Sequence, residues 1–216
     1  MNRWEPNARE RLEQAAMELY RERGFDETTV AEIAERAGLT ERTFFRYFAD
    51  KREVLFGGAG ALEELLIHEL QSAPDSAAPI VAVAAALEAT APLFEQRRDF
   101  ARHRHALITG HAELRERELI KLASLASAIA AALRRRSVPE PAASLAAEMG
   151  IAIFKIAFEH WVKDSKGRDL AHHVREALKA LQGVTGASAV AGASSSSSRA
   201  TNPSRAKKEK PRRRSG

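Results

Sequence analysis

The chain has 216 residues, which is long enough for one or two domains with a proper core, and its 44% hydrophobic and 29% charged residues are typical of a soluble protein. It contains no cysteine, which excludes disulfides, thiolate metal ligands and a cysteine nucleophile. The formal net charge is +5, but residues 184–216 hold eight basic side chains against one acidic, so the preceding residues are close to neutral.

The N-terminal third begins with two helices that the spacing of apolar residues predicts. In the first helix, apolar residues recur three and four positions apart on one face, and Gly24 can end the helix. The second helix repeats the pattern from Val30 to Ala37, and Thr29 with Glu32 forms the Thr-x-x-Glu capping box that begins it. The buried face of the first helix is expected to contain Leu12, Ala15, Ala16, Leu19 and Tyr20.

A tight turn at Gly38 leads into a third, short helix from Thr40 to Phe48, which Thr40 can cap. On a helical wheel of about 100° per residue, Phe44 and Phe48 point together toward the two preceding helices. The opposite side carries Arg42 and Arg46, flanked by Thr43 and Phe45. This arrangement predicts a helix-turn-helix, whose outer side suits the guanine edges and phosphates of a DNA major groove.

The rest of the chain is also predicted to be helical, because apolar residues recur three and four apart and no strand alternation is found. Asp50 and Glu53 form another capping box, which opens a helix through about Leu70. Pro74 and Pro79 mark the next break. Further helices are predicted at about 79–91, 93–109, 111–136, 141–163 and 169–182. The expected fold class is therefore all-α.

The helix opened by Asp50 contains the sequence GGAG at residues 57–60. Each glycine inside a helix costs roughly 1 kcal/mol relative to alanine, so this turn is expected to be the weakest of the helix. Two interpretations remain open for this turn, which contains Gly57, Gly58 and Gly60. It is either a soft joint through which a bound ligand shifts the helix, or a close contact with the first helix where only a missing side chain fits.

The segment TTVAEIAERAGLTERTFFRYFADKREVL resembles the DNA-binding segment of the TetR family of bacterial transcriptional repressors, and the likeness extends over roughly residues 8 to 66. In that family a Gly-[Val/Leu]-[Ser/Thr] turn precedes Thr-[Leu/Phe]-Tyr-x-His-Phe and a lysine. The resemblance implies a homodimer, a palindromic operator and a C-terminal domain that binds a small effector. We thus expect a helix-turn-helix domain at 6–66, with its motif at about 29–48, and a larger helical ligand-binding and dimerisation domain at 70–183.

The resemblance also assigns roles to single residues. Thr29, at the start of the second helix, matches a phosphate contact, and Lys51 matches a lysine that anchors a phosphate. Phe45 stands where the family usually has Tyr, and Tyr47 stands where it usually has His. Phe45 therefore lacks a hydroxyl for the DNA backbone, and Tyr47 can supply one in its place.

Four further positions complete the expected DNA-binding surface. Thr40 and Thr43 match positions that touch the DNA backbone or bases, while Glu41 and Arg42 match the variable positions that set sequence choice. Two interpretations of Glu41 remain open: it accepts from a cytosine amine, or it simply favours the N-terminus of its helix. The full expected set is Thr29, Thr40, Glu41, Arg42, Thr43, Phe45, Arg46, Tyr47 and Lys51.

The effector pocket is expected to be apolar with a few polar groups. Its expected lining is Leu65, Leu66, Phe94, Phe100, Met149 and Phe154. The densely charged run from 95 to 121 is expected to be mostly exposed or locally ion-paired, with a few members in the pocket. The last two helices resemble those that pair across a two-fold axis in the family, because the first of them is apolar on two sides. The expected dimer interface is Ile151, Phe158, Trp161, Val162, Val174 and Leu178.

Neither a metal nor a cofactor is expected. His103 and His105 lie two positions apart and His172 and His173 are adjacent, so neither pair has the i, i+4 spacing of a helical zinc site. No phosphate-binding glycine loop, nucleophile elbow or paired-carboxylate signature is found, so the chain is not expected to be an enzyme. An enzyme with an appended DNA-binding domain is the weakest interpretation.

The preferred interpretation is a ligand-responsive repressor that binds DNA and a small molecule. The main alternative is an architectural, nucleoid-type DNA-binding protein whose basic tail, residues 184–216, dominates binding. That tail is rich in Ser, then in Lys and Arg, and is expected to be disordered. No signal peptide or membrane-spanning run is found, so a cytoplasmic protein with no membrane partner is expected.

Overall fold

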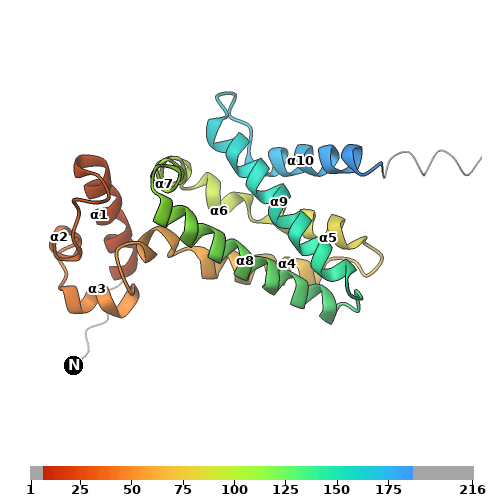
Figure 1. Cartoon of the computed structure of the whole chain (residues 1–216), viewed down its shortest axis with the longest axis horizontal. Coiled ribbons are helices and arrows are strands. Elements are labelled where there is room, and N and C mark those ends of the chain that lie inside the picture. The colour runs from red at the N-terminus through yellow and green to blue at the C-terminus, as the bar shows by residue number, and fades with distance from the viewer. Residues whose placement is uncertain (1–6, 187–216) are drawn as a thin grey trace, which may run out of the picture. The chain divides into compact units, whose positions relative to one another are not determined.

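A computed structural model of the chain describes residues 7–186. Within this range the chain forms ten α-helices, one 3₁₀ helix and no strand, which confirms the all-α prediction (Figure 1). The described residues up to Leu181 belong to one compact unit. The expected disordered tail lies outside the described residues, apart from residues 184–186. The elements are α1 (Ala8–Arg23), α2 (Val30–Arg36), α3 (Glu41–Tyr47), η1 (Glu53–Phe56), α4 (Ala59–Ser72), α5 (Pro79–Ala89), α6 (Ala91–Glu95), α7 (Arg98–Gly110), α8 (Ala112–Arg135), α9 (Ala142–Lys163) and α10 (Leu170–Val184).

Local capping fixes the helix-turn-helix as its sequence predicts. The hydroxyl of Thr29 accepts from the N–H of Glu32 at 3.3 Å, and the carboxylate of Glu32 accepts from the N–H of Thr29 at 2.9 Å. Thr40 caps α3 by accepting from the N–H of Thr43 at 3.2 Å. Between the two helices, Gly38 has a φ of 64°, in the left-handed region that glycine tolerates best. Both capping interactions and the glycine turn are therefore confirmed.

The helix-turn-helix has an apolar core of its own. Phe44 and Phe48 are 0% and 3% exposed, and they pack against the predicted buried face of α1. Ile108 at the end of α7 and Leu114 at the start of α8 belong to the same core and are fully buried. The α7–α8 corner therefore completes the packing of the N-terminal helices, although it lies far along the chain.

The long helix expected to start at Asp50 is interrupted. The carboxylate of Asp50 does accept from the N–H of Glu53 at 3.1 Å, but the element that follows is the short 3₁₀ helix η1. The helix is interrupted after η1, and α4 begins only after Gly58. A β-carbon at Gly57 would lie 2.4 Å from a carboxylate oxygen of Glu13, whereas one at Gly58 would meet nothing within 4 Å. Close packing thus explains Gly57, and Gly58 lies at a helix start rather than inside a helix.

The second and larger core lies among α4, α5, α8, α9 and α10, and Figure 1 shows α8 beside α4 and α9. Alanines make close approach possible here, and Gly150 of α9 lies against Val83 of α5, where a β-carbon would be 2.4 Å from a methyl group. The predicted helix at 93–109 is divided into α6 and α7. The other predicted helices after Pro79 are confirmed within about two residues at each end.

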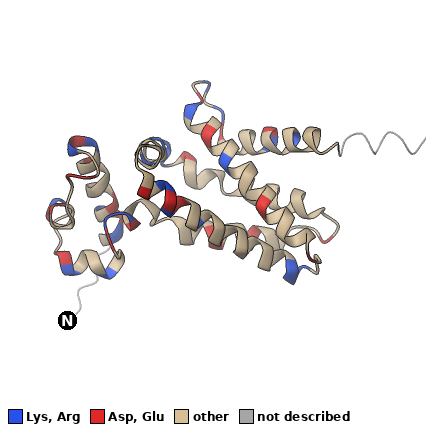
Figure 2. Cartoon of the chain, in the orientation of Figure 1, with Lys and Arg blue, Asp and Glu red and all other residues tan. Residues whose placement is uncertain are grey.

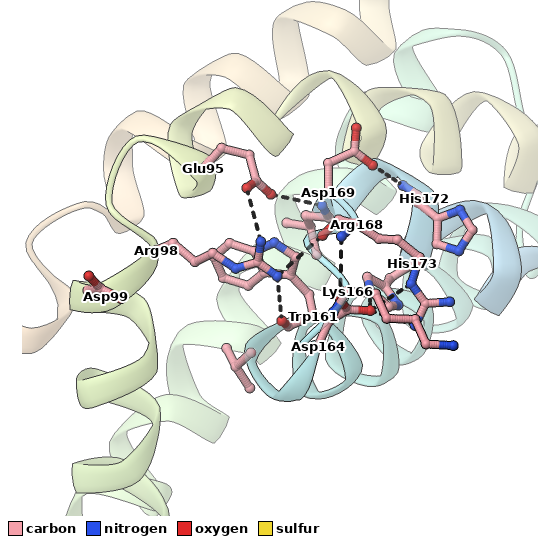
Figure 3. Close-up of polar contacts among 12 residues, drawn as sticks. Glu95, Arg98, Asp99, Trp161, Asp164, Lys166, Arg168, Asp169, His172 and His173 are labelled. Carbon is pink, nitrogen blue, oxygen red and sulfur yellow. Dashed lines mark hydrogen bonds and ion pairs between the residues drawn. The ribbon is translucent and has the colours of Figure 1, made fainter.

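A buried polar network holds the junction between α9 and α10 (Figure 3). The carboxylate of Asp164 accepts from Nε of Arg168 at 2.6 Å and from the N–H of Lys166 at 2.6 Å, and it lies 3.2 Å from Nε2 of His173. Although burial opposes ionisation, these hydrogen bonds lower the pKa of Asp164 to about 2. Burial lowers the pKa of His173, which the neighbouring carboxylate only partly offsets. Arg98 of α7 joins the network by donating to the carbonyl of Trp161 at 3.1 Å.

Candidate DNA-binding surface and effector cavity

The outer side of α3 is exposed and carries the residues expected at DNA. Glu41, Arg42 and Arg46 are exposed, as are the two capping residues Thr29 and Thr40, while Thr43 is half-buried. Among the contacts of the described residues, Glu41 and Arg42 make no hydrogen bond or ion pair, so both side chains are available to a partner. Phe45 is 55% exposed, and its ring makes an edge-to-face contact with the Phe44 ring at 5.5 Å between centroids.

Arg46 and Tyr47 form a pair at the end of α3. The guanidinium of Arg46 lies 4.9 Å from the Tyr47 ring centroid and donates to the Tyr47 hydroxyl at 3.1 Å. A stacked arginine loses less freedom when it binds a phosphate or a base edge, because its orientation is already restricted. Both residues therefore remain candidates for DNA contact. The Tyr47 hydroxyl can make the contact for which Phe45 has no hydroxyl.

The half-buried side chain of Lys51 is held by hydrogen bonds within the domain. Its ammonium donates to the carbonyls of Phe25, Asp26 and Thr28 at 2.8, 3.0 and 2.9 Å. It also lies 4.5 Å from the Phe25 ring centroid, and its own carbonyl accepts from the Tyr20 hydroxyl at 2.7 Å. Three carbonyls satisfy the three N–H groups of an ammonium. The geometry thus favours a tether between the α1–α2 loop and η1 over the expected phosphate anchor.

Charges of both signs occur in the part of the chain formed by α1–α3 and in the remaining helices, as Figure 2 shows. Neither part is uniformly basic in this view. Figure 2 agrees in this respect with the near-neutral charge of the chain before residue 184.

A cavity of about 580 Å³ lies where the helix-turn-helix meets the larger core. Its walls come from η1, the first turn of α4, α6, α7, α8 and α9, with Glu13 of α1 at one side. The rings of Phe94, Phe154 and Phe158 pack together in its wall, with centroids 5.7–5.8 Å apart. A mostly apolar cavity of this size is typical of a site for a small organic molecule.

Only part of the predicted effector-pocket lining lines this cavity. Phe94, Phe100 and Phe154 line the cavity. Leu65, Leu66 and Met149 do not: Leu66 is fully buried in the larger core, and the other two are half-buried away from the cavity. The first turn of α4 faces the cavity instead, through residues that include Leu62.

The sequence did not single out the polar residues of the cavity. Arg104 of α7 donates to the carbonyl of Leu55 in η1 at 2.7 Å and to the carboxylate of Glu118 in α8 at 3.1 Å. Burial lowers the pKa of Arg104, which Glu118 partly counteracts. Lys121 of α8 lies on the same wall. These residues fall in the charged run at 95–121, whose density indicated local ion pairs but not which members face inward.

Most residues of the expected dimer interface are buried within the single chain. Ile151, Phe158, Trp161, Val162 and Val174 are at most 9% exposed, and all belong to the larger core of the same subunit. Leu178 is half-buried. Among the apolar side chains that do reach the surface are Leu119 and Ile120 of α8 and Leu145 and Ile156 of α9, each at least 48% exposed. The two apolar sides of α9 are used inside the subunit, where α5 and α8 both pack against it.

Neither a metal centre nor a membrane span is found in the part of the chain that the structure describes. Residues 7–186 contain no group of three His, Asp or Glu side chains placed to hold a metal ion. No helix in this range is long and apolar enough to cross a bilayer.

Comparison with known proteins identifies the class. The model of bacterial regulatory proteins of the tetR family matches residues 13–56, and the model of the MftR C-terminal domain matches residues 77–186, about half of the chain. The chain therefore belongs to the TetR family, and it is a DNA-binding transcriptional regulator.

Two relatives are similar in sequence. One is the protein described as the mycofactocin biosynthesis transcriptional regulator MftR of Mycobacterium tuberculosis, which is 28% identical over 187 residues that cover 82% of this chain and 88% of MftR. The other is the HTH-type transcriptional regulator TcmR of Streptomyces glaucescens, which is 37% identical over 81 residues, or 38% of this chain. The chain spans 36% of the length of TcmR in that match.

Solved structures show the same fold. The TetR-family repressor FadR of Thermus thermophilus, in complex with lauroyl-CoA, is 27% identical with a TM-score of 0.50, over 80% of this chain and 92% of FadR. A complex of SmeT with triclosan is 20% identical with a TM-score of 0.57, over 82% of this chain and 90% of SmeT. At that identity the SmeT complex is evidence for the fold alone.

Proposed function

We propose that this regulator is a ligand-responsive repressor that binds a palindromic operator as a homodimer, with α3 in the major groove. The carrying observation is the outer side of α3, where Arg42 stands exposed without a partner among the described residues and Arg46 lies beside the Tyr47 hydroxyl. Arginine is the commonest reader of guanine edges, and the hydroxyls of Thr40 and Thr43 suit phosphates.

The homodimer is proposed on the surface that the single chain leaves apolar. Leu119 and Ile120 of α8 and Leu145 and Ile156 of α9 are exposed, and a second copy that covers them would place two α3 helices on one duplex. Ile156→Glu is expected to shift the protein toward a monomer in sedimentation experiments. An unchanged dimer would assign the interface to another surface.

The effector is proposed to occupy the cavity between η1, α4, α7 and α8. Its wall of Phe94, Phe154 and Phe158 favours an apolar ligand, and the similar FadR structure holds lauroyl-CoA. Arg104 connects this wall to η1 through the carbonyl of Leu55. A ligand that displaces Arg104 would therefore disturb η1, which follows the Lys51 tether of the helix-turn-helix.

Selection of bound sequences from random DNA tests the proposal. We expect the full chain to enrich one palindrome, and a chain lacking residues 187–216 to enrich the same palindrome at physiological salt. Loss of the basic tail is expected to lower only the non-specific, salt-sensitive part of the affinity. Enrichment that disappears with the tail would favour the architectural alternative.

A further inference from the structure

A second, polar pocket of about 250 Å³ lies beside the apolar cavity. It forms where the end of α3, η1 and the start of α4 approach α1 and α8. None of the residues that the sequence assigns to the effector lines it. Its lining includes the side chains of Arg9, Tyr47, Glu53, Arg117 and Lys121 and the backbone around Gly57 and Gly60.

Cationic groups outnumber carboxylates in this pocket. Arg117 donates from Nε to one carboxylate oxygen of Glu53, and Lys121 Nζ lies 3.1 Å from the other. Partial burial opposes the ionisation of Glu53, but the hydrogen bonds from Arg117 and Lys121 lower its pKa. Arg9 approaches from α1 and donates to the carbonyl of Gly57. Three cations and one carboxylate therefore line the pocket, and Arg9 is also paired with Glu13 of α1 at 3.5 Å.

The polar pocket and the apolar cavity share a wall. Phe56, Ala59, Gly60 and Lys121 line both. The glycine leaves open space, since a β-carbon at Gly60 would meet nothing within 4 Å. The ammonium of Lys121 thus stands at the boundary, reached from the apolar side and from the polar side. A molecule with an apolar body and a charged end would meet both environments over a short distance.

We propose that the polar pocket binds the anionic group of an amphipathic ligand whose apolar body occupies the cavity. The assignment rests on the proposed function, because it concerns the charged end of that effector. Arg117 and Lys121 bind the phosphate or carboxylate group, and Arg9 faces it from α1. Arginine and lysine recognise both anions through charge-assisted hydrogen bonds.

Binding of the ligand anion by Arg117 and Lys121 also explains how the ligand would release DNA. Glu53 belongs to η1, and its pairs with Arg117 and Lys121 hold η1 against α8. A ligand anion competes with Glu53 for these cations and so loosens the connection. Tyr47, at the end of α3, lines the same pocket. Ligand and operator therefore favour different arrangements of η1 and α3, and each must weaken the binding of the other.

The test uses ligands that share one apolar chain and differ in charge: dodecanol, dodecyl phosphate and lauroyl-CoA, each below its critical micelle concentration, with inorganic phosphate alone. Binding to the full-length protein is measured by calorimetry. We expect dodecyl phosphate to bind at least about tenfold more tightly than dodecanol, because one charge-assisted hydrogen bond contributes about that much affinity. In lauroyl-CoA the phosphates lie far from the acyl chain. Its affinity therefore shows whether the anionic group must lie close to the apolar chain of the ligand.

Variants locate the contact. Lys121→Gln and Arg117→Gln are each expected to reduce the preference for dodecyl phosphate over dodecanol about tenfold, while Lys121→Arg retains it. Arg135→Gln is the matched control, since Arg135 is exposed on the same helix and lines neither site. Thermal unfolding of each variant checks its fold, and the ratio of the two affinities cancels any general loss of binding.

Three outcomes would overturn the inference. These are equal binding of dodecanol and dodecyl phosphate, a preference that both glutamine variants keep, and no binding by any amphiphile. If dodecanol alone binds and releases the selected operator, the proposed function stands and the anionic pocket fails. If the protein enriches no operator, the proposed function fails independently of these ligands.

Discussion

The helix-turn-helix and the helical body differ in how much of their structure is determined by neighbours in sequence. In the first, Thr29, Gly38 and Thr40 form their caps and turn with residues at most three or four positions away. In the body, the long helices are joined by contacts across many residues, such as the hydrogen bond from Arg98 to the carbonyl of Trp161. Local chemistry makes the DNA-binding part recognisable, while distant packing creates the cavity.

The largest expected effect concerns two adjacent phenylalanines of α3. Phe44 is fully buried in the core of the helix-turn-helix, whereas Phe45 is 55% exposed. Phe44→Ala is expected to lower the free energy of unfolding by about 3–5 kcal/mol. Phe45→Ala is expected to change it by less than about 0.5 kcal/mol. Urea unfolding measures both, and equal losses would contradict the assignment of the two faces of α3.

The next prediction separates a tether from a DNA contact at Lys51. Lys51→Met removes three hydrogen bonds from a charged donor, and we expect a loss of about 2–3 kcal/mol in unfolding free energy without DNA present. Arg52→Met is the control, because Arg52 is nearly half exposed and forms a surface pair with Asp50 worth less than about 1 kcal/mol. Unchanged stability together with equally weakened binding to all DNA would restore the phosphate anchor.

A third prediction compares the two glycines at the break before α4. Gly57→Ala would place a methyl group against the carboxylate of Glu13, which Arg97 holds at 3.0 Å, and is expected to cost about 1–3 kcal/mol. Gly58→Ala meets open space and is expected to stay within about 0.5 kcal/mol of the parent. A large loss at Gly58 and none at Gly57 would show that the break is placed wrongly.

The smallest expected effect is a pH dependence of the body. The folded state lowers the pKa of His173 below its ordinary value of 6.5, so protonation favours the unfolded state. Stability is therefore expected to fall as the pH drops below about 6.5, and Asp164 adds a further loss as the pH falls from about 4 toward 2. His173→Gln is expected to flatten the upper part of this profile, whereas the exposed His68→Gln leaves it unchanged. A profile that neither variant alters would exclude His173 as the cause.

The sequence predicted the helix-turn-helix because its signals are local. A Thr-x-x-Glu box and a glycine turn act within one helical turn, and the two sides of α3 follow from spacing alone. Helical spacing did not predict the interruption before α4. The expected alternative, close packing of this turn against the first helix, holds at Gly57, where the neighbour is the carboxylate of Glu13, 44 positions earlier in the chain.

The body shows the limit of helical periodicity. The apolar pattern of α9 correctly required two burial partners, but it did not distinguish another helix of the same subunit from a second subunit. Phe158 illustrates this limit, since it was expected at the dimer interface and lines the cavity of the single chain. Arg104 and Lys121 were hidden in a charged run, where only the fold decides which side chains face inward.

The most direct test of the account is the affinity of Arg42→Ala for the operator selected by the parent protein. If α3 reads the major groove, this variant loses about 1–3 kcal/mol of binding free energy and relaxes base preference at one position of each half-site. Arg135→Ala, at an exposed arginine remote in sequence from α3, keeps the parent affinity at the same salt concentration. An Arg42→Ala protein that binds the operator with the affinity and base preference of the parent would contradict the account.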